Sequence, residues 1–199
     1  MRALTPEEER AWIRQLRKRD ERAFTQLVRE FQTPVYNLVS RMMGYRRDEA
    51  LDVAQEVFVT VFRAIDGFRG ESKLSTWIYR IAVNHCRNRL KYLSRRRHER
   101  HDELDDAQVE RSGSPGEVAF PRPDRALEGA RAERFLQDTI AALDDEPREI
   151  LVLRDIQGLT YEEIGEVTGL PDGTVKSRLH RARKSIQEAY DRWQGKELP

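Results

Sequence analysis

The stretch that decides the fold lies at residues 160–186 and reads Thr-Tyr-Glu-Glu-Ile-Gly-Glu-Val-Thr-Gly-Leu-Pro-Asp-Gly-Thr-Val-Lys-Ser-Arg-Leu-His-Arg-Ala-Arg-Lys-Ser-Ile. It predicts two short helices joined by a tight turn. Thr160 and Glu163 have capping-box spacing, in which hydroxyl and carboxylate each accept a hydrogen bond from the other residue's otherwise unpaired backbone amide. Gly169 ends the first helix, and Asp172 suits the positive end of the second.

The second of these helices has an apolar face and a basic face. The apolar positions recur at helical spacing and are Val175, Leu179, Ala182 and Ile186. The outward positions are Ser177, His180, Arg181 and Lys184, flanked by Lys176 and Arg183. No acidic residue occurs from Gly173 to Gln187. This is the layout of a helix-turn-helix whose second helix enters the major groove of DNA.

The alternative for this helix is an amphipathic surface helix with a solvated basic face. Such a helix would usually carry charges of both signs, and it would leave the capped partner helix unexplained. The complete helix-turn-helix pattern therefore favours duplex DNA as the ligand.

The composition favours small, highly charged helical modules over one large core, since the 199 residues are 38% hydrophobic and 36% charged. The net charge is only +1, but the charges are unevenly distributed. Residues 74–98 contain no acidic residue and seven Arg or Lys, whereas residues 99–117 contain seven Asp or Glu. Local basic surfaces, and not the net charge, therefore decide where phosphate groups can be neutralised.

Several kinds of protein are disfavoured by what the sequence lacks. The single cysteine, Cys86, excludes an intramolecular disulfide and a multi-cysteine zinc site. No apolar run approaches transmembrane length, and the charged N-terminus lacks the apolar core of a signal peptide. We therefore expect a cytoplasmic protein with no cofactor, no bound metal and no insertion into a membrane.

Apolar residues recur at helical spacing along most of the chain, and no segment has the pattern of a strand. We expect a helix over 21–43 that Pro34 kinks or interrupts. A second helix starts at Asp48, and a third is capped by Ser75 or Thr76. The expected inward residues of the second helix are Leu51, Ala54, Val57, Phe58, Val61, Phe62 and Ile65.

Helical periodicity stops after residue 98 and resumes near residue 127. Residues 99–124 are polar, acidic and contain Gly, Pro and Ser, so they cannot bury enough apolar surface to offset the entropy of ordering. We interpret them as a flexible acidic linker. The predicted fold is all-α: two small helical domains, residues 1–98 and 125–199, of which the second carries the helix-turn-helix.

A second candidate site lies in the loop 66–76 and the helix that follows it. The loop contributes the aromatic residue Phe68, and the polar residues are Arg69, Lys73, Arg80, Asn84, Arg87, Asn88 and Lys91. Splayed bases need apolar walls and amide edges, and their backbone needs cations, so this mixture suits single-stranded or distorted nucleic acid. Trp77 sits among apolar neighbours and is expected to be mainly a core residue.

Three segments of the N-terminal part resemble a known family: Asp-Val-Ala-Gln-Glu-Val-Phe at 52–58, Ile-Asp-Gly-Phe-Arg-Gly at 65–70 and Ser-Thr-Trp-Ile-Tyr-Arg-Ile-Ala-Val-Asn at 75–84. They look like the core-binding and promoter-melting domain (domain two) of bacterial RNA polymerase sigma factors, in the extracytoplasmic-function group. The segments at 143–151, 158–165 and 173–183 resemble domain four of that group, which is its other DNA-binding domain.

The resemblance implies a sigma factor that binds core RNA polymerase, directs it to specific promoters and nucleates promoter opening. It assigns Asp52, Gln55 and Glu56 to the beta-prime clamp of the polymerase. It assigns to the minus-ten promoter element Phe68, Arg69, Lys73, Ser75, Arg80, Asn84, Arg87, Asn88 and Lys91, with Asn84 lining the pocket for a flipped base. It assigns to the minus-thirty-five element Lys176, Ser177, Arg178, His180, Arg181 and Lys184.

The resemblance also implies the beta flap of the polymerase and an anti-sigma factor as partners, and no small-molecule substrate. The residues themselves leave two other functions open. A stand-alone helix-turn-helix regulator shares the C-terminal pattern, but it would need a ligand-binding or phosphoacceptor domain, usually with strands. An enzyme acting on nucleic acid would need a metal-ligand spacing or a Gly-rich phosphate loop, and the chain has neither, so we expect no catalytic activity.

Overall fold

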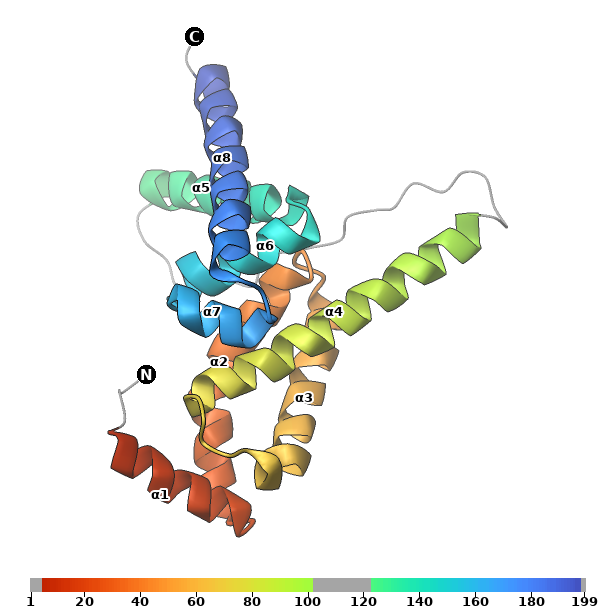
Figure 1. The fold of residues 1–199 in the computed structure, drawn as a ribbon. Coiled ribbons are helices and arrows are strands. Elements are labelled where there is room, and N and C mark those ends of the chain that lie inside the picture. Colours follow the sequence, from red (N-terminus) through yellow and green to blue (C-terminus); the bar gives the residue numbers. More distant parts are fainter. Residues whose placement is uncertain (1–4, 102–122, 198–199) are drawn as a thin grey trace.

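The computed structural model of the chain describes residues 5–101 and 123–197 (Figure 1). Within these two ranges every regular element is a helix and no strand occurs, so the predicted all-α fold is confirmed. We call residues 5–101 the N-terminal half and residues 123–197 the C-terminal half.

The N-terminal half contains α1 (Pro6–Arg17), α2 (Glu21–Met42), α3 (Arg47–Ala64), the 3-10 turn η1 (Ile65–Gly67) and α4 (Leu74–His101). The C-terminal half contains α5 (Pro123–Ala142), α6 (Asp145–Leu151), the π-helical turn η2 (Val152–Ile156), α7 (Tyr161–Thr168) and α8 (Asp172–Glu197). Helix α4 crosses α2 and α3, and α7 lies beside it (Figure 1). The two halves therefore meet along both α4 and α2.

The predicted linker, residues 99–124, lies mostly outside the described residues. Its first three residues belong to the end of α4 and its last two to the start of α5, so both helices extend further than the sequence pattern predicts.

Pro34 does not interrupt α2, which runs as one helix from Glu21 to Met42. Phe31, Val35 and Leu38 are buried on both sides of the proline, at 3%, 0% and 0% exposure. Burying such side chains contributes about 2 kcal/mol each, which outweighs the cost of about 3 kcal/mol for one interior proline. The predicted interruption is therefore wrong.

Helix α3 buries most of the predicted face, since Ala54 is 8% exposed and Val57, Val61 and Ile65 have no exposed surface. Leu51 and Phe62 are the exceptions, at 42% and 47% exposure. The ring of Phe62 packs on Phe24, with ring centroids 4.7 Å apart. Leu51 and Phe62 lie at one edge of the buried face, where periodicity alone does not decide whether a neighbouring helix covers a side chain.

The start of α4 is capped by a residue from another helix. The helix begins at Leu74, and the amide of Leu74 donates a hydrogen bond to Oε1 of Glu9 in α1 over 2.9 Å. Thr76, one of the two predicted caps, is instead buried. Helix α1 itself was not predicted, although Thr5 and Glu8 form a capping box with Pro6 at the first helical position.

The helix-turn-helix is built as predicted. Thr160 accepts a hydrogen bond from the Glu163 amide over 3.2 Å, and Glu163 accepts one from the Thr160 amide over 2.9 Å. Gly169 ends α7 with φ of 74°, in the left-handed region that favours glycine. Val175, Leu179 and Ala182 of α8 are buried against the rest of the C-terminal half.

A buried arginine joins the two halves. The guanidinium of Arg148 donates hydrogen bonds to the carbonyls of Ile140 and Ala141, at 3.1 and 3.0 Å, and to that of Leu143. It also donates to the carbonyl of Met42, at the end of α2, over 3.0 Å. Burial lowers the pKa of Arg148, and Asp145 opposes that shift. One side chain therefore satisfies carbonyl groups at the ends of α2 and α5.

We predict that Arg148→Met lowers the free energy of unfolding by about 3 kcal/mol, because it leaves several buried carbonyls without donors. Urea unfolding followed by circular dichroism measures this change. The matched control is Arg131→Met on the exposed side of α5, which should change the free energy by less than about 0.5 kcal/mol. Equal stability of the two variants would contradict a structural role for Arg148.

Candidate nucleic-acid interface

Five of the predicted minus-ten residues form one stripe along α4. They are Arg80, Asn84, Arg87, Asn88 and Lys91, at spacings that place them on a single helix face. The opposite face is buried, since Ile78 and Ala82 have no exposed surface. All members of the stripe are exposed except Arg87, which is partly buried. The helix thus fixes its basic and amide groups relative to the core.

The loop before α4 borders a hollow of about 460 Å³. The lining residues are Gly67, Phe68, Arg69, Glu71, Ser72, Trp77 and Arg80, together with Glu166 from α7. Asn84, which the resemblance assigns to the base pocket, is not among them and lies one helical turn beyond Arg80 on α4. A hollow with an aromatic floor and cationic edges has the composition expected of a site for an unstacked base.

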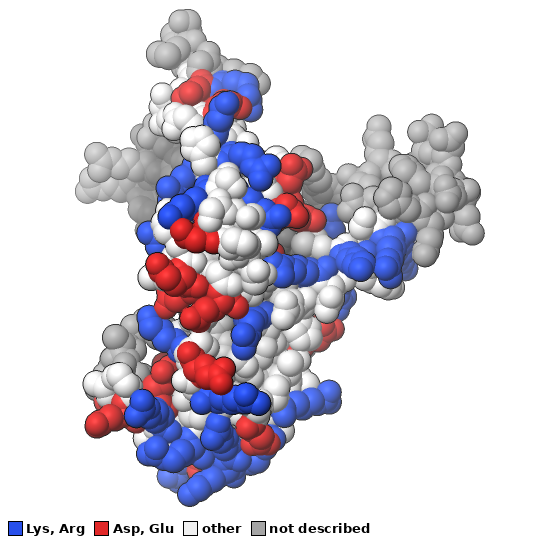
Figure 2. Space-filling model, viewed as in Figure 1, with Lys and Arg blue, Asp and Glu red and all other residues white. Residues whose placement is uncertain are grey.

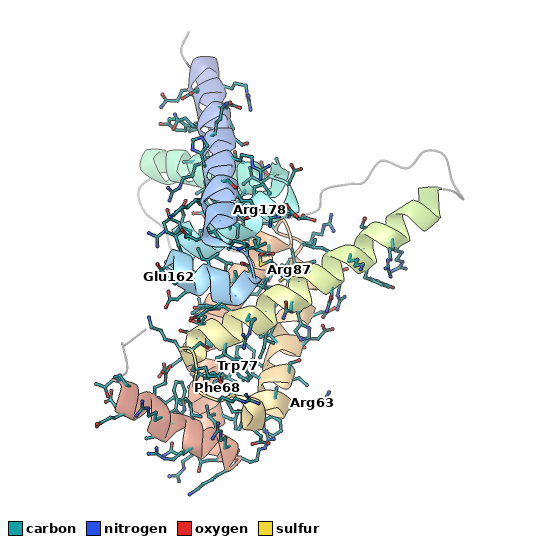
Figure 3. The ribbon with its side chains drawn as sticks, viewed as in Figure 1. Arg63, Phe68, Trp77, Arg87, Glu162 and Arg178 are labelled. Atoms are coloured by element: carbon teal, nitrogen blue, oxygen red, sulfur yellow. The ribbon has the colours of Figure 1, made fainter. Side chains whose placement is uncertain are left out.

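Phe68 lies at the floor of this hollow rather than on an exposed loop. It is 3% exposed, and its ring packs on Trp77 with centroids 5.0 Å apart. Trp77 is 8% exposed, so its predicted core role is confirmed (Figure 3). Of the neighbouring predicted residues, Arg69 is exposed beside Glu71 at 3.9 Å, and Ser75 is partly buried.

Lys73 and Arg87 are already paired with acidic groups of the C-terminal half. Nζ of Lys73 lies 2.8 Å from Oε1 of Glu163. Arg87 donates to both carboxylate oxygens of Glu149, at 2.9 and 2.6 Å, and lies 3.4 Å from the carbonyl of Thr168. The hydrogen bonds that Lys73 and Arg87 donate to these carboxylates raise the pKa of both cations. The sequence carries no signal for these pairs, because the partners are 90 and 62 residues apart.

The three predicted polymerase-binding residues share a second, open hollow of about 410 Å³ between α3 and α4. Its lining residues are Asp52, Gln55, Glu56, Val59, Thr60, Arg63 and His85. Val59, Arg63 and His85 were not assigned from the sequence. Val59 is 47% exposed, so the hollow combines carboxylates with an uncovered apolar side chain, as protein-binding surfaces do.

Glu56 is held in place by α4. Its Oε1 accepts a hydrogen bond from Arg89 over 2.9 Å, and its Oε2 lies 3.4 Å from Nδ1 of His85. Arg89 also binds Glu49 over 2.9 Å, and Nε2 of His85 lies 2.9 Å from the hydroxyl of Thr60. These contacts fix the carboxylate side of the hollow relative to α4.

Some of the predicted minus-thirty-five residues of α8 are exposed, and others form ion pairs with acidic residues. Ser177, His180 and Arg181 are exposed. Lys176 forms an ion pair with Asp172 at 2.6 Å, and the hydrogen bond that it donates to Asp172 raises the pKa of Lys176. Lys184 lies 3.8 Å from Glu188. The positive charge of the outward face is therefore concentrated at Arg181, and nearby carboxylates balance the charges of Lys176 and Lys184 at its two ends.

Arg178 points toward the C-terminal core rather than outward (Figure 3). Its side chain is 17% exposed and lies 2.7 Å from a carboxylate oxygen of Glu146. In this arrangement it links α8 to α6.

Among the residues that the structure describes, no group of three or more His, Cys, Asp or Glu side chains could hold a metal ion. In the same part of the chain, no helix is both long and apolar enough to span a membrane.

Comparison with known proteins identifies the family. Residues 27–96 match the family model of sigma-70 region 2, and residues 136–186 match that of sigma-70 region 4. The chain is 37% identical to the RNA polymerase sigma-H factor of Pseudomonas aeruginosa over 94% of this chain and 95% of that protein. It is 35% identical to the ECF RNA polymerase sigma-E factor of Escherichia coli over 87% of this chain and 90% of that protein.

Each half of the chain thus carries the sigma-70 region expected of a promoter-directing factor, region 2 before region 4. The protein belongs to the extracytoplasmic-function (ECF) sigma factors of RNA polymerase. It directs RNA polymerase to promoters for transcription initiation. The region 2 match in the N-terminal half favours this function over a stand-alone helix-turn-helix regulator.

Solved structures share the fold. CnrH, in a structure of its complex with the cytosolic domain of CnrY, has a TM-score of 0.64 and 26% identity, over 92% of this chain and 97% of that one. The sigma factor RpoE of Bartonella quintana, solved with the anti-sigma factor NepR, has a TM-score of 0.65 and 23% identity, over 84% and 96% of the two chains.

Cys86 offers a direct test of the packing behind the α4 stripe. It has no exposed surface, and burial raises the pKa of its thiol to about 12, with the charge of Glu149 adding to the shift. Since the thiolate is the reactive form, a rise from 9.0 to about 12 lowers its population at pH 8 by about a thousandfold.

We predict that iodoacetamide at pH 8 modifies the native protein at least about a hundredfold more slowly than the protein in concentrated urea. Mass spectrometry of the intact chain over time measures both rates. Similar rates would show that Cys86 is accessible and that α4 does not pack as described.

Proposed function

We propose that this sigma factor reads two promoter elements with two surfaces. The hollow beside Phe68 and the α4 stripe bind the minus-ten element and capture one flipped base. The outward face of α8 binds the minus-thirty-five element in duplex DNA. The observation that carries the proposal is that the hollow beside Phe68 adjoins the stripe, because Arg80 belongs to both.

The stripe has the chemistry for an opened strand. Asn84 and Asn88 are exposed amides that can bond to base edges, while Arg80, Arg87 and Lys91 can neutralise phosphates. Unstacking a base costs a few kcal/mol. A pocket that binds the unstacked base supplies that free energy, so promoter opening needs no nucleotide hydrolysis.

The hollow lined by Asp52, Gln55 and Glu56 is the proposed docking site for the beta-prime clamp. Charge-assisted hydrogen bonds to basic clamp residues would use the carboxylates, and the exposed Val59 would provide apolar contact. The C-terminal half would contact the beta flap. The clamp assignment uses the side of α4 that carries His85, away from the α4 stripe.

Three further assignments belong to this proposal. Residues 1–98 and 125–199 act as separate modules, with residues 99–124 as their tether. The factor works in the cytoplasm and catalyses no reaction itself. An anti-sigma factor controls it, a partner suggested by the Bartonella quintana RpoE–NepR complex, whose sigma factor shares this fold.

On a promoter that this factor recognises, we predict that Asn84→Ala lowers the rate of open-complex formation by about tenfold, because the flipped base loses an amide partner. Permanganate reactivity of unpaired thymines measures opening, and gel filtration with core polymerase measures binding, which should not change. The control is Gln32→Ala, which removes an exposed amide from α2. Wild-type opening by the Asn84 variant would reject the pocket.

We predict that Arg181→Ala weakens promoter binding by about 1–3 kcal/mol if it contacts a guanine, or lowers the salt slope of log K by about 1 if it contacts a phosphate. Holoenzyme titrations of a minus-thirty-five promoter fragment at several salt concentrations distinguish the two. The control is Arg192→Ala, an exposed arginine near the other end of α8. Equal effects of the two variants would contradict the assignment.

A further inference from the structure

Helix α1 runs alongside the loop 68–73, which connects η1 to α4 (Figure 1). The C-terminal end of α1 contacts η1, where the loop begins, and its N-terminal part lies near the start of α4, where the loop ends. Most of the hollow beside Phe68 belongs to this stretch, because five of its eight lining residues lie between positions 67 and 72. The position of α1 therefore bears on the shape of the hollow.

Glu9 of α1 binds the end of the loop at α4. The helix begins at Leu74, so the preceding residue, Lys73, occupies the position whose side chain usually accepts a hydrogen bond from the first turn. The ammonium group of a lysine has no acceptor. Oε1 of Glu9 accepts the Leu74 amide instead, over 2.9 Å, and its carboxylate lies at the positive end of α4.

Arg17 of α1 binds the beginning of the loop. Its guanidinium donates a hydrogen bond to the carbonyl of Phe68, whose ring is buried on Trp77 at the floor of the hollow. Figure 2 shows several Lys and Arg side chains at the end of the molecule where α1 lies. Of the two basic residues in the last turn of α1, Arg14 and Arg17, only Arg17 makes this bond within the described residues. We call Glu9 and Arg17 the α1 anchors of the loop.

The helix that carries the α1 anchors is itself fixed. Leu16 has no exposed surface, and the indole of Trp12 donates a hydrogen bond to the carbonyl of Ala23 in α2 over 3.1 Å. Just after the helix, Arg19 binds Asp66 of η1 over 2.5 Å. The α1 anchors therefore belong to a helix that is packed on α2 and bonded to η1.

The middle of the loop is exposed to solvent. Arg69, Gly70 and Glu71 are all exposed, and the ion pair between Arg69 and Glu71, at 3.9 Å, lies within the loop itself. An exposed segment of this kind opens locally more readily than the helices beside it. Its two bonded ends therefore restrict where the middle of the loop can lie.

We propose that α1 is a positioning element of the minus-ten site, in which Glu9 and Arg17 hold the two ends of the loop 68–73 at a fixed spacing. The two residues are eight positions apart, or about 12 Å along the helix axis. That spacing sets the shape of the hollow, and with it the preference among bases at the flipped position. Neither residue lines the hollow, so both act through the loop. This inference rests on the proposed function, which assigns the hollow to a flipped base.

Loss of the α1 anchors should loosen the loop, and trypsin measures this without DNA. Trypsin cleaves after Arg and Lys, so Arg69 and Lys73 report on the loop directly. Glu9→Ala combined with Arg17→Ala should increase cleavage at these two positions of the native full chain by about tenfold, because cleavage follows the population of locally open forms. Mass spectrometry of the fragments identifies the sites.

In the holoenzyme, the same double variant should lose base preference. Permanganate reactivity measures opening of a recognised promoter and of variants carrying each of the four bases at each minus-ten position. The ratio of opening rates between the best and the worst base should fall about fivefold at one position, that of the flipped base. Gel filtration should show unchanged binding to core polymerase. A chain that was merely destabilised would lose opening on all four bases alike.

The conservative variant Glu9→Gln should retain most of the wild-type base preference, because its amide oxygen can still accept the Leu74 amide. The matched control is Glu7→Ala combined with Arg14→Ala, which removes the same charges from exposed positions of α1. Equal effects of the two double variants on cleavage and on base preference would overturn the inference.

Two further outcomes separate this inference from the proposed function. If Asn84→Ala slows opening but loss of the α1 anchors leaves either tryptic cleavage or base preference unchanged, the inference is overturned and the proposed function stands. If Asn84→Ala opens the promoter like wild type, the proposed function fails, and the inference is overturned with it even where cleavage increases.

Discussion

The hydrogen bonds of Arg148 determine how the two halves meet. Its guanidinium is buried and donates to carbonyls near the ends of α5 and α2. Helix C-termini carry unpaired carbonyls and a partial negative charge, so a buried cation is stable there. The next residue, Glu149, binds Arg87 on α4. Two consecutive side chains of α6 thus fix the C-terminal half on both α2 and α4.

Helix α4 connects the surfaces of the N-terminal half because its faces differ in chemistry. One face is buried, one binds the carboxylates of α3 through Arg89, and one carries the polar stripe. A helix is stiff, so a partner that docks on the hollow between α3 and α4 also sets the position of the stripe. Under the proposed function, docking on polymerase and reading of the promoter would therefore be linked mechanically through α4.

The parts of the fold that were predictable depend on local chemistry. The capping box at Thr160, the left-handed turn at Gly169 and the apolar face of α8 are each specified within a few residues. Long-range contacts were not predictable in the same way. Glu9 caps α4 from 65 residues away, and Arg19 covers the exposed ring of Phe62 at 4.7 Å. The spacing of apolar residues in the sequence gives no information about such long-range contacts.

In the candidate sites, too, features specified within one helix were predictable and features that depend on distant contacts were not. Residue types and helical spacing were enough to assemble the α4 stripe and the three docking residues, because each set lies on one helix. The burial of Phe68 was not predictable, since it depends on packing against Trp77, whereas helical spacing already places Arg178 near the apolar face of α8 that Val175 and Leu179 form. The ion pairs of Lys73 and Arg87 with the C-terminal half were not predictable either. Because of these pairs, neither cation is without an acidic partner in this structure.

The central proposal is that the two halves read two promoter elements with two separate surfaces, which requires the pairs of Lys73 and Arg87 with the C-terminal half to part on the promoter. Energy transfer between dyes at Tyr92→Cys on α4 and Glu188→Cys on α8, in a Cys86→Ala background, tests it most directly. The account predicts efficient transfer in the free chain and a marked loss of transfer when the chain is bound to core polymerase on a promoter. Equal efficiency in the two states would contradict it.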